Sequence, residues 1–250
     1  MIQYLAGIFD SEGYVRIRKT KSGNNYSYTY ECRIYMCELS IVNLFAERYD
    51  LTIKSSERGV NRKTAYYITF NGKDLRNSTF ISDILPFLNE KRLQLQEIKN
   101  LIEGQDKETC YQKYLEAKKS FIHPIVGELS FPYIAGVIDG DGWFTMFNAG
   151  KVVKSIRNTF AVGIEQRYFP LINYMLRFGG DTNIRTIKDS INHIQTYEWK
   201  IGDSSMLELL IAIEPFLIEK REKCQTLIKY IEKYEEFRQY SKKVLTWWKE

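Results

Sequence analysis

The sequence predicts an α+β protein built from a duplicated helix-strand-strand-helix-strand-strand-helix unit (αββαββα), with two antiparallel four-stranded sheets and two apolar helices packed at the interface. An apolar stretch that ends in an acid and a glycine occurs twice, at residues 5–13 (LAGIFDSEG) and 134–142 (IAGVIDGDG). A second stretch, 86–92 (PFLNEKR), recurs at 215–221 (PFLIEKR). Both pairs are separated by 129 residues, and two elements that share one offset indicate a tandem duplication.

The chain has 250 residues, of which 44% are apolar and 14% aromatic, so it can bury a sizeable core. The duplication divides it into an N-terminal repeat at 1–103, a connector at 104–132 and a C-terminal repeat at 133–250. No apolar run reaches the roughly 20 residues of a membrane span, and no signal-peptide pattern opens the chain. We therefore expect a soluble, intracellular protein, and the composition does not distinguish an organellar, bacterial or phage origin.

The cysteines and histidines argue against a zinc site, a disulfide framework or a histidine-based reaction centre. The four cysteines include no CxxC pair, and the two histidines have no recognisable ligand spacing. We expect both histidines to be structural. The residues concerned are Cys32, Cys37, Cys110, Cys224, His123 and His193.

Positive charge and aromatic rings are concentrated in one segment. The net charge of +5 is modest, but between Tyr14 and Met36 the basic residues greatly outnumber the one acid, Glu31. Tyrosines are interleaved with them, a combination typical of a nucleic-acid-binding surface. The basic residues are Arg16, Arg18, Lys19, Lys21 and Arg33.

Each helix and strand of the first repeat follows from its own pattern. Residues 14–19 alternate strictly, which predicts a strand with Val15 and Ile17 facing the core and Tyr14, Arg16 and Arg18 facing the other way. A turn at 22–25 leads to a returning strand at 27–36. Helices are expected at 41–49, at 74–85 with Asp74 as N-cap, and at 90–102, and a second strand pair at 51–54 and 65–70.

The connector is charged and irregular apart from a short helix expected at 109–120. In the second repeat, alternation of Phe160, Val162 and Ile164 marks the core face of a strand. The last helix is long and amphipathic; we expect it to pack on the back of its own sheet, with a coiled-coil partner helix as the alternative. Strands are expected at 143–146, 158–166, 183–187 and 196–201, and helices at 170–178, 204–213 and 218–240.

The repeated apolar stretch is suited to close contact between two helices. Adjacent Ala-Gly pairs at 6–7 and 135–136 would let the helices touch almost backbone to backbone. Gly13 and Gly142 fit the glycine that ends a helix in a left-handed turn.

The acids of this stretch are in an unfavourable place for negative charge. Glu12 and Asp141 would lie at the carboxyl ends of their helices, where the helix dipole already disfavours a carboxylate. If the helices pack side by side, the two acids also come close together, which costs stability unless a divalent cation compensates. A local rule broken in the same way in both repeats indicates a functional site.

These motifs resemble those of the LAGLIDADG homing endonucleases, specifically their two-repeat, single-chain form, and the resemblance covers nearly the whole chain. It implies that Glu12 and Asp141 bind catalytic divalent cations, most simply Mg²⁺, with Mn²⁺ as a substitute and Ca²⁺ as an ion that binds without supporting cleavage. It also implies a pseudo-symmetric monomer whose sheets form a saddle on double-stranded DNA. The target would span about two duplex turns and receive a double-strand break.

The resemblance also assigns residues around the acids. Lys91 and Lys220 occupy positions where the family commonly has a basic residue near the active site, and a surface salt bridge with Glu90 or Glu219 is the alternative. Gln166 matches a polar residue that the family often uses to order water.

The first repeat departs from this pattern. Residues 34–38 contain no glutamine, and Glu38 is the plausible stand-in, which puts the symmetry of the solvent network in doubt. Asp10 and Asp139 are expected to be structural and to close the helix end rather than to bind metal.

Basic and aromatic residues on strands and loops are the expected DNA contacts. A two-stranded ribbon fits the major groove of B-DNA, and Lys and Arg would neutralise phosphates and set the register. For any one of these residues, the alternative is an ordinary solvated side chain. They are Arg16, Arg18, Arg33, Tyr35, Arg58, Arg62, Lys63, Lys151, Lys154, Arg157 and Arg185.

Two other kinds of function stay open. Proteins similar to this family have become intron RNA maturases or DNA-binding regulators, which keep the saddle and drop cleavage. Both motif positions are acidic here, which favours the nuclease. A purely structural repeat protein would not explain two acids at helix carboxyl ends or the basic, tyrosine-rich hairpin.

Overall fold

The structure is a computed structural model that describes residues 1–57, 63–120, 123–126, 129–148, 158–188, 193–202 and 206–233. Within these ranges the side chains of 146–148, 158–160, 185–188 and 193–195 are not described.

The first half begins with the apolar helix and continues through two hairpins and three further helices. The bounds are α1 Ile2–Glu12, β1 Gly13–Ser22, β2 Asn25–Met36, α2 Leu39–Tyr49, β3 Lys54–Ser56, β4 Ala65–Phe70, α3 Gly72–Asn77, α4 Phe80–Ile84 and α5 Arg92–Ile102. The helix α6, Lys107–Ala117, lies in the connector.

The second half repeats this order. Its bounds are α7 Phe131–Asp141, β5 Gly142–Asn148, β6 Asn158–Gln166, α8 Phe169–Met175, η1 Leu176–Phe178, β7 Asp181–Lys188, β8 His193–Gly202, α9 Leu207–Ile213 and η3 Glu214–Phe216. Residues 221–233 form a further helix. Both sheets are antiparallel, in the orders β1-β2-β4-β3 and β5-β6-β8-β7. The predicted duplicated α+β architecture is therefore confirmed.

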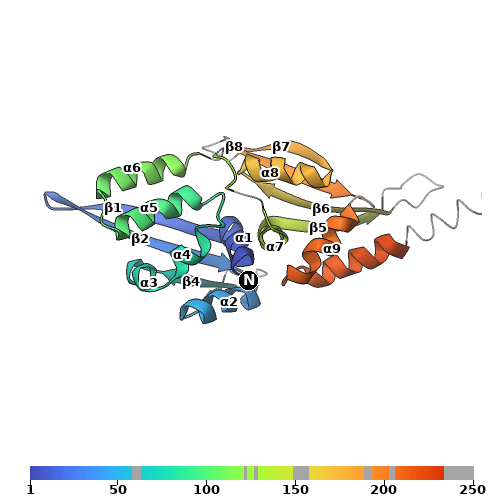
Figure 1. Cartoon of the computed structure of the whole chain (residues 1–250), viewed down its shortest axis with the longest axis horizontal. Coiled ribbons are helices and arrows are strands. Elements are labelled where there is room, and N and C mark those ends of the chain that lie inside the picture. The colour runs from blue at the N-terminus through green and yellow to red at the C-terminus, as the bar shows by residue number, and fades with distance from the viewer. Residues whose placement is uncertain are drawn as a thin grey trace, which may run out of the picture.

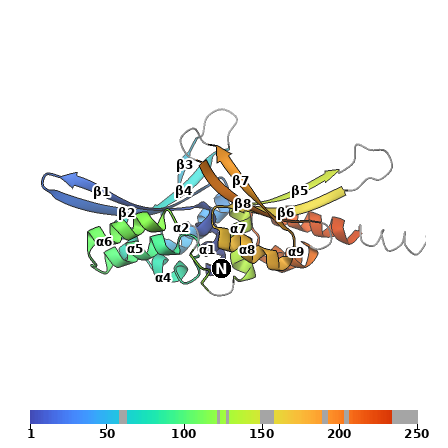
Figure 2. The ribbon, with the colours of Figure 1, turned by 90° about the horizontal axis from the view of Figure 1, so that it is seen from above.

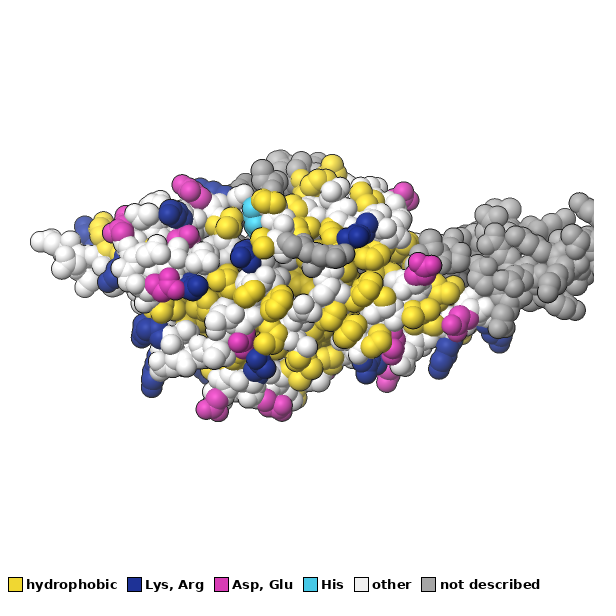
Figure 3. Space-filling model, viewed as in Figure 1, with side chains coloured by type: hydrophobic (Ala, Val, Ile, Leu, Met, Phe, Trp, Pro, Cys, Tyr) yellow, Lys and Arg dark blue, Asp and Glu magenta, His cyan; other side chains and the backbone are white. Residues whose placement is uncertain are grey.

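The two sheets lie along the long axis of the molecule, with the helices gathered on one side of them (Figures 1 and 2). The β1–β2 and β5–β6 hairpins extend toward opposite ends, and α1 and α7 meet at the centre. On the helix-covered side, hydrophobic side chains spread across the middle of the surface (Figure 3). The two halves are thus joined through α1 and α7, which we call the motif helices. The sheet faces that are not covered by helices lie on the opposite side of the molecule (Figure 2).

Close contact between α1 and α7 depends on their glycines, as predicted. A Cβ at Gly7 would lie under 3.0 Å from the Tyr133 carbonyl oxygen, and one at Gly136 would lie equally close to the Tyr4 carbonyl oxygen. Real Cβ atoms essentially never approach that closely. The backbones of the two halves therefore pack directly against each other at these positions.

The predicted left-handed turns at Gly13 and Gly142 are wrong. Both residues are extended, with φ −77° and ψ 154° at Gly13 and φ −81° and ψ 165° at Gly142. They begin β1 and β5 without an intervening loop. Glycine is needed for space rather than for positive φ, because a Cβ would meet the carbonyl oxygen of Phe9 or Ile138.

The strands of the first sheet follow the predicted alternation, and two boundaries differ. Val15 and Ile17 are buried, while β3 begins at Lys54 and the residues before it are irregular. The helix predicted at 74–85 is two helices. Asn71, not Asp74, caps α3. Its side chain accepts hydrogen bonds from the backbone N–H groups of Lys73 and Asp74, and the Asp74 carboxylate accepts one from the Asn71 N–H. This capping box starts the helix earlier.

The connector helix α6 supports the first hairpin. It begins at Lys107, two residues before the predicted start at 109, with Asp106 as its N-cap. Tyr114 donates a hydrogen bond to the Val15 carbonyl oxygen at 3.0 Å. The Glu108 carboxylate accepts hydrogen bonds from Lys19 and Tyr28 on the helix-facing side of β1 and β2. The connector therefore braces the hairpin from behind as well as linking the halves.

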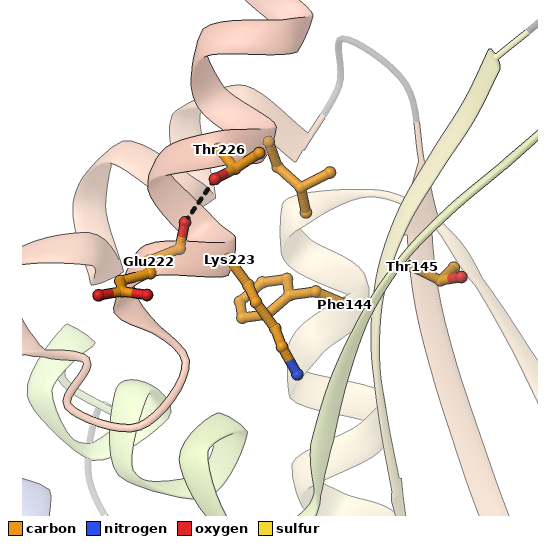
Figure 4. Close-up of a pocket in the computed structure, with 6 residues that line it drawn as sticks. Phe144, Thr145, Glu222, Lys223 and Thr226 are labelled. Carbon is orange, nitrogen blue, oxygen red and sulfur yellow. Dashed lines mark hydrogen bonds between the residues drawn. The ribbon is translucent and has the colours of Figure 1, made fainter.

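Leu227 and Ile231 place one face of the helix at 221–233 in the core, which favours the expected packing on its own half. The rest of the predicted 218–240 helix lies partly outside the described residues. A cavity of about 300 Å³ separates this helix from β5 and includes Phe144 and Thr226 in its lining (Figure 4). Phe144 follows Val15 by the repeat offset of 129, and in the first half the Val15 carbonyl oxygen accepts a hydrogen bond from Tyr114 of α6.

Among the described residues, no helix combines the length and the apolar character that crossing a membrane would require.

Candidate active site at the helix interface

Glu12 and Asp141 are the last residues of α1 and α7 and share one electrostatic environment. Burial and the negative charge of Asp141 raise the pKa of Glu12. Burial likewise raises the pKa of Asp141. The Glu12 side chain also lies close to Gly140 at the end of α7. Two residues separated by 129 positions are thus brought into one partly buried centre.

Lys91 reaches the carboxyl end of α1. Its ammonium donates to the Asp10 carbonyl oxygen, lies 3.5 Å from the Ser11 carbonyl oxygen, and is 3.7 Å from the Glu90 carboxylate. The salt bridge with Glu90 that was the alternative is present, but it is not on the surface, because Lys91 is only 9% exposed. The positive charge of Lys91 offsets the negative end of the helix dipole. It also lowers the pKa of Glu12, against the effect of burial.

Lys220 makes the equivalent contacts at the end of α7. Its ammonium donates to the carbonyl oxygens of Ile138, at 2.8 Å, and of Asp139. Burial lowers the pKa of Lys220, while nearby carboxylates, beginning with Glu219, oppose that shift. Both lysines therefore bind the helix ends that carry the two acids.

Asp10 and Asp139 hold in place the two segments that carry the lysines, residues 89–91 and 218–220, which we call the lysine segments. The Asp10 carboxylate accepts the backbone N–H groups of Asn89 at 2.6 Å and Lys91 at 2.8 Å. Asp139 accepts those of Ile218 at 2.7 Å and Lys220 at 2.9 Å. Both aspartates are 1% exposed. They connect each motif helix to the lysine segment of the same half, a more specific role than the expected closing of the helix end.

Glu90 belongs to this centre and was missed in the sequence. Its side chain is 15% exposed, and burial raises its pKa to about 7, with the charges of Asp10 and Asp141 adding to the shift and Lys91 opposing it. The signal was present, because a Glu-Lys pair recurs at 90–91 and 219–220. It was interpreted as a surface pair.

Gln166 contacts the acid of its own half. Its amide donates to Asp141 Oδ2 at 2.8 Å, and its Oε1 is buried without a hydrogen-bond partner among the described residues. In the first sheet the corresponding last residue of the second strand is Met36, which is 5% exposed. Glu38, the expected stand-in, instead caps α2 by accepting from Ser40. The polar network around the acids is therefore asymmetric.

The donors suit a hard divalent cation. No group of three or more His, Cys, Asp and Glu side chains that could hold a metal is found in the described part of the chain. The carboxylates of Glu12 and Asp141 come together here, and the amide oxygen of Gln166 nearby has no hydrogen-bond partner among the described residues. Mg²⁺ is commonly held by one or two carboxylates with water and phosphate oxygens completing its octahedron, so this oxygen set fits it.

Several expected DNA contacts lie on the outer face of the first sheet. Arg16 and Arg33 flank Glu31, at 3.7 and 4.0 Å, and Arg16, Arg18 and Arg33 line a hollow of about 470 Å³. The ring of Tyr35 lies 5.9 Å from that of Tyr67. Basic and aromatic side chains are thus brought together on this face.

The other residues expected to contact DNA are exposed, lack a described side chain or lie outside the described residues. Lys63 is exposed. Arg185 lies in β7, but its side chain is not described. Residues Arg58, Arg62, Lys151, Lys154 and Arg157 lie outside the described residues.

The histidines and cysteines are placed as follows. His123 is in the connector, where its Nε2 is 2.6 Å from the Asn89 carbonyl oxygen and its ring lies 4.9 Å from that of Tyr168. This is a structural position. The side chain of His193 in β8 is not described. All four cysteines are free thiols.

No protein-family model matches the sequence, and no curated protein sequence is found to match it. Solved structures do match. I-GzeII, a LAGLIDADG homing endonuclease in complex with its DNA target, is 13% identical, with a TM-score of 0.68 over 94% of this chain and 92% of that chain. I-SmaMI, a LAGLIDADG homing endonuclease bound to cleaved DNA, is 14% identical, with a TM-score of 0.69 over 95% and 91%.

The LAGLIDADG meganuclease I-AabMI, bound to uncleaved DNA, is similar to the same extent, at 15% identity and a TM-score of 0.68 over 94% of this chain and 92% of that chain. The alignments cover both halves and the helix interface between them. This chain has the two-repeat, pseudo-symmetric fold of the LAGLIDADG homing endonucleases.

Proposed function

We propose that this protein is a site-specific DNA endonuclease that makes a double-strand break by phosphodiester hydrolysis. The observation that carries the proposal is the shared centre of Glu12 and Asp141 at the ends of two helices in contact. The proposed cofactor is Mg²⁺, and the proposed target is a duplex of about two turns. Because one chain supplies both acids, the protein would act as a monomer, and because its proposed substrate is DNA, it would act inside the cell.

The electrostatics of the centre support a cation. Burial raises the pKa of both acids, the charge of Asp141 raises that of Glu12 further, and the two lysines only partly offset these shifts. A divalent cation would reverse the repulsion between Glu12 and Asp141. Helix ends that carry uncompensated carboxylates are otherwise difficult to explain by stability.

Hydrolysis requires a water oxygen to bond to phosphorus while the bond from phosphorus to one ester oxygen breaks. The proton lost by the water balances the proton gained by the leaving oxygen. When bound, a divalent cation supplies a more acidic water and neutralises charge that develops on the phosphate. Glu12 and Asp141 would hold it.

The lysines and Gln166 would act around this reaction. Lys91 and Lys220 place positive charge at the two helix ends, where it would stabilise the developing negative charge of one phosphate each. The unpartnered Oε1 of Gln166 can accept a hydrogen bond from water beside Asp141. Because the acids come from two similar halves, each half would address one strand.

The outer sheet faces would bind the DNA. Arg16, Arg18 and Arg33 lie together on the first sheet, and arginines neutralise phosphates or read guanine edges. The similar structures I-GzeII and I-AabMI are bound to DNA. The position of the three arginines supports an interface along the sheets rather than on the helix-covered side.

The experiment is a selection of cleaved sites from a randomised duplex library in Mg²⁺, with EDTA as the negative control. A plasmid that carries the selected site is then given to Glu12→Gln and Asp141→Asn. We expect each variant to lose linearisation by at least about 100-fold while its circular dichroism and its DNA binding in Ca²⁺ are retained. Glu116→Gln, on the exposed face of α6, is the matched control and should cleave normally.

Two outcomes would contradict the proposal. Linearisation of the plasmid by either acid variant at the rate of the unmodified chain would remove that residue from the reaction. If the unmodified chain enriches bound DNA and cuts none of it in Mg²⁺ or Mn²⁺, the protein is a binding protein of the regulator or maturase type.

A further inference from the structure

Two tyrosines link the motif helices across the interface. The Tyr133 hydroxyl of α7 donates to Asp10 Oδ2 of α1 at 2.6 Å. The Tyr4 hydroxyl of α1 donates to Asp139 Oδ2 of α7 at 2.7 Å. All four side chains are at most 2% exposed. The exchange is reciprocal, so each half supplies a phenol to the aspartate of the other.

Each of these aspartates also holds a lysine segment. Asp10 accepts the Lys91 N–H, and the Lys91 ammonium binds the carboxyl end of α1 beside Glu12. The route therefore runs from Tyr133 in one half to Asp10, Lys91 and Glu12 in the other. It crosses from one repeat to the other once, at the phenol.

The second route has the same order with the halves exchanged. Tyr4 donates to Asp139, which accepts the Lys220 N–H, and the Lys220 ammonium binds the carboxyl end of α7 beside Asp141.

The phenols are suited to constant donation. Burial and the charge of the contacted aspartate raise the pKa of Tyr4 and of Tyr133 well above the ordinary tyrosine value, so both hydroxyls keep their proton. A hydrogen bond to a buried carboxylate is among the stronger ones, and its loss removes one of the donors that hold a carboxylate out of reach of water. The aspartate keeps its backbone N–H donors, so removing one hydroxyl should shift the aspartate together with the lysine segment that supplies those donors.

We propose that Tyr4 and Tyr133 are positioning residues that act across the interface, each on the lysine segment of the opposite half, so that each controls cleavage of one DNA strand. The inference rests on the nuclease function proposed above. It adds that neither half has a complete reaction centre without a phenol from the other. A tandem repeat with independent halves would not need this exchange.

The test uses a duplex of the selected target with a different fluorophore on each strand, cut under single-turnover conditions in Mg²⁺. Tyr133→Phe should slow one strand by about 10-fold relative to the other, as expected for the loss of one hydrogen bond to a charged group. Tyr4→Phe should slow the opposite strand. Nicked DNA should accumulate in both cases, with the nick in different strands.

The matched control is Tyr114→Phe. Tyr114 is also 2% exposed, and its hydroxyl also donates a buried hydrogen bond, but to the Val15 carbonyl oxygen within the first half rather than to an aspartate across the interface. It should lower stability and leave the ratio of the two strand rates unchanged. Thermal unfolding and DNA binding in Ca²⁺ are measured for all variants, so that a general loss of folding is separated from a change in strand preference.

A double variant checks the route. In a Lys91→Met background, Tyr133→Phe should add no further strand-selective slowing, because the group it positions is gone. Full additivity would contradict the route.

The remaining outcomes are also decisive. Equal slowing of both strands, or slowing of the same strand by both tyrosine variants, would overturn the inference while the cleaving unmodified chain still supports the nuclease. Absence of cleavage by the unmodified chain would overturn the proposed function and this inference with it.

Discussion

Glu90 shows how burial changes the charge of one residue in this centre. Its pKa is raised from 4.5 to about 7, first by desolvation and then by the charges of Asp10 and Asp141. Because the folded state holds this proton more tightly than the unfolded chain does, the contribution of Glu90 to stability falls as pH rises from about 4.5 to about 7.

Glu90→Gln should therefore change the pH dependence of stability. The variant cannot ionise, so at pH 8 its free energy of unfolding should exceed that of the unmodified chain by about 2 to 3 kcal/mol, and near pH 4 the two should converge. Urea denaturation at several pH values measures this. Glu116→Gln, on exposed α6 surface, serves as control. Parallel stability curves for Glu90→Gln and the unmodified chain would show that Glu90 does not titrate in this window.

Single residues also explain which assignments were predictable. Glu12 and Asp141 were found because their position at helix ends breaks a local rule in both repeats. Tyr4 and Tyr133 were not found, since an apolar helix gives no sign that its first-turn aromatic residues reach across to another helix. Glu38 was misassigned because the register that aligns Gln166 with Met36 depends on strand pairing.

At the scale of elements, the interface of α1 with α7 depends on two glycines. Gly136→Ala would place a Cβ against the Tyr4 carbonyl oxygen and the Ile8 N–H, both parts of the α1 backbone. Backbone cannot move aside as a flexible side chain does, so the helices must separate.

We expect Gly136→Ala to lower the free energy of unfolding by about 1 to 3 kcal/mol, measured by urea denaturation. Gly72→Ala is the matched control, because the nearest atom to its Cβ would be 3.4 Å away, in ordinary contact with the Tyr30 ring. Equal stability of the two variants would mean that the helices are not in backbone contact.

The brace of α6 behind the first hairpin gives a second prediction at this scale. Hydrogen bonds from Lys19 and Tyr28 lower the pKa of Glu108 to about 2, so this support is present above about 4.5 and is lost as pH falls through about 2. Glu108→Ala should speed amide hydrogen exchange in β1 and β2 at neutral pH and leave the second sheet unchanged. Glu116→Ala, on the same helix, is the control, and similar exchange in both variants would argue against a brace.

For the whole molecule, the arrangement separates a basic sheet face from a helix-covered face with a hydrophobic middle (Figures 2 and 3). If the sheets bind DNA, replacing Arg16 and Arg18 together by Ala should weaken binding and reduce the salt slope of the binding constant by up to about two units. Titrations of labelled duplex at several salt concentrations measure the slope. Lys99→Ala with Lys113→Ala removes the same charge from α5 and α6 and should leave the slope nearly unchanged.

If instead the control pair changes the slope and the arginine pair does not, the DNA lies on the helix-covered side. A result of that kind would move the interface without affecting the fold or the position of the acids.

The sequence by itself determined the duplicated architecture, the order of most elements, the core face of the first hairpin and the two acids. These depend on periodicity, on spacing and on local rules for helix ends, which are properties of neighbouring residues. Only the tertiary structure decided the extended conformation of Gly13 and Gly142, the two-helix break before Phe80, the bracing role of α6 and the reciprocal phenol-to-aspartate exchange. The phenol-to-aspartate bonds and the contacts of α6 with the hairpin join residues separated by 80 or more positions. Contacts at such distances along the chain produce no periodic pattern in the sequence.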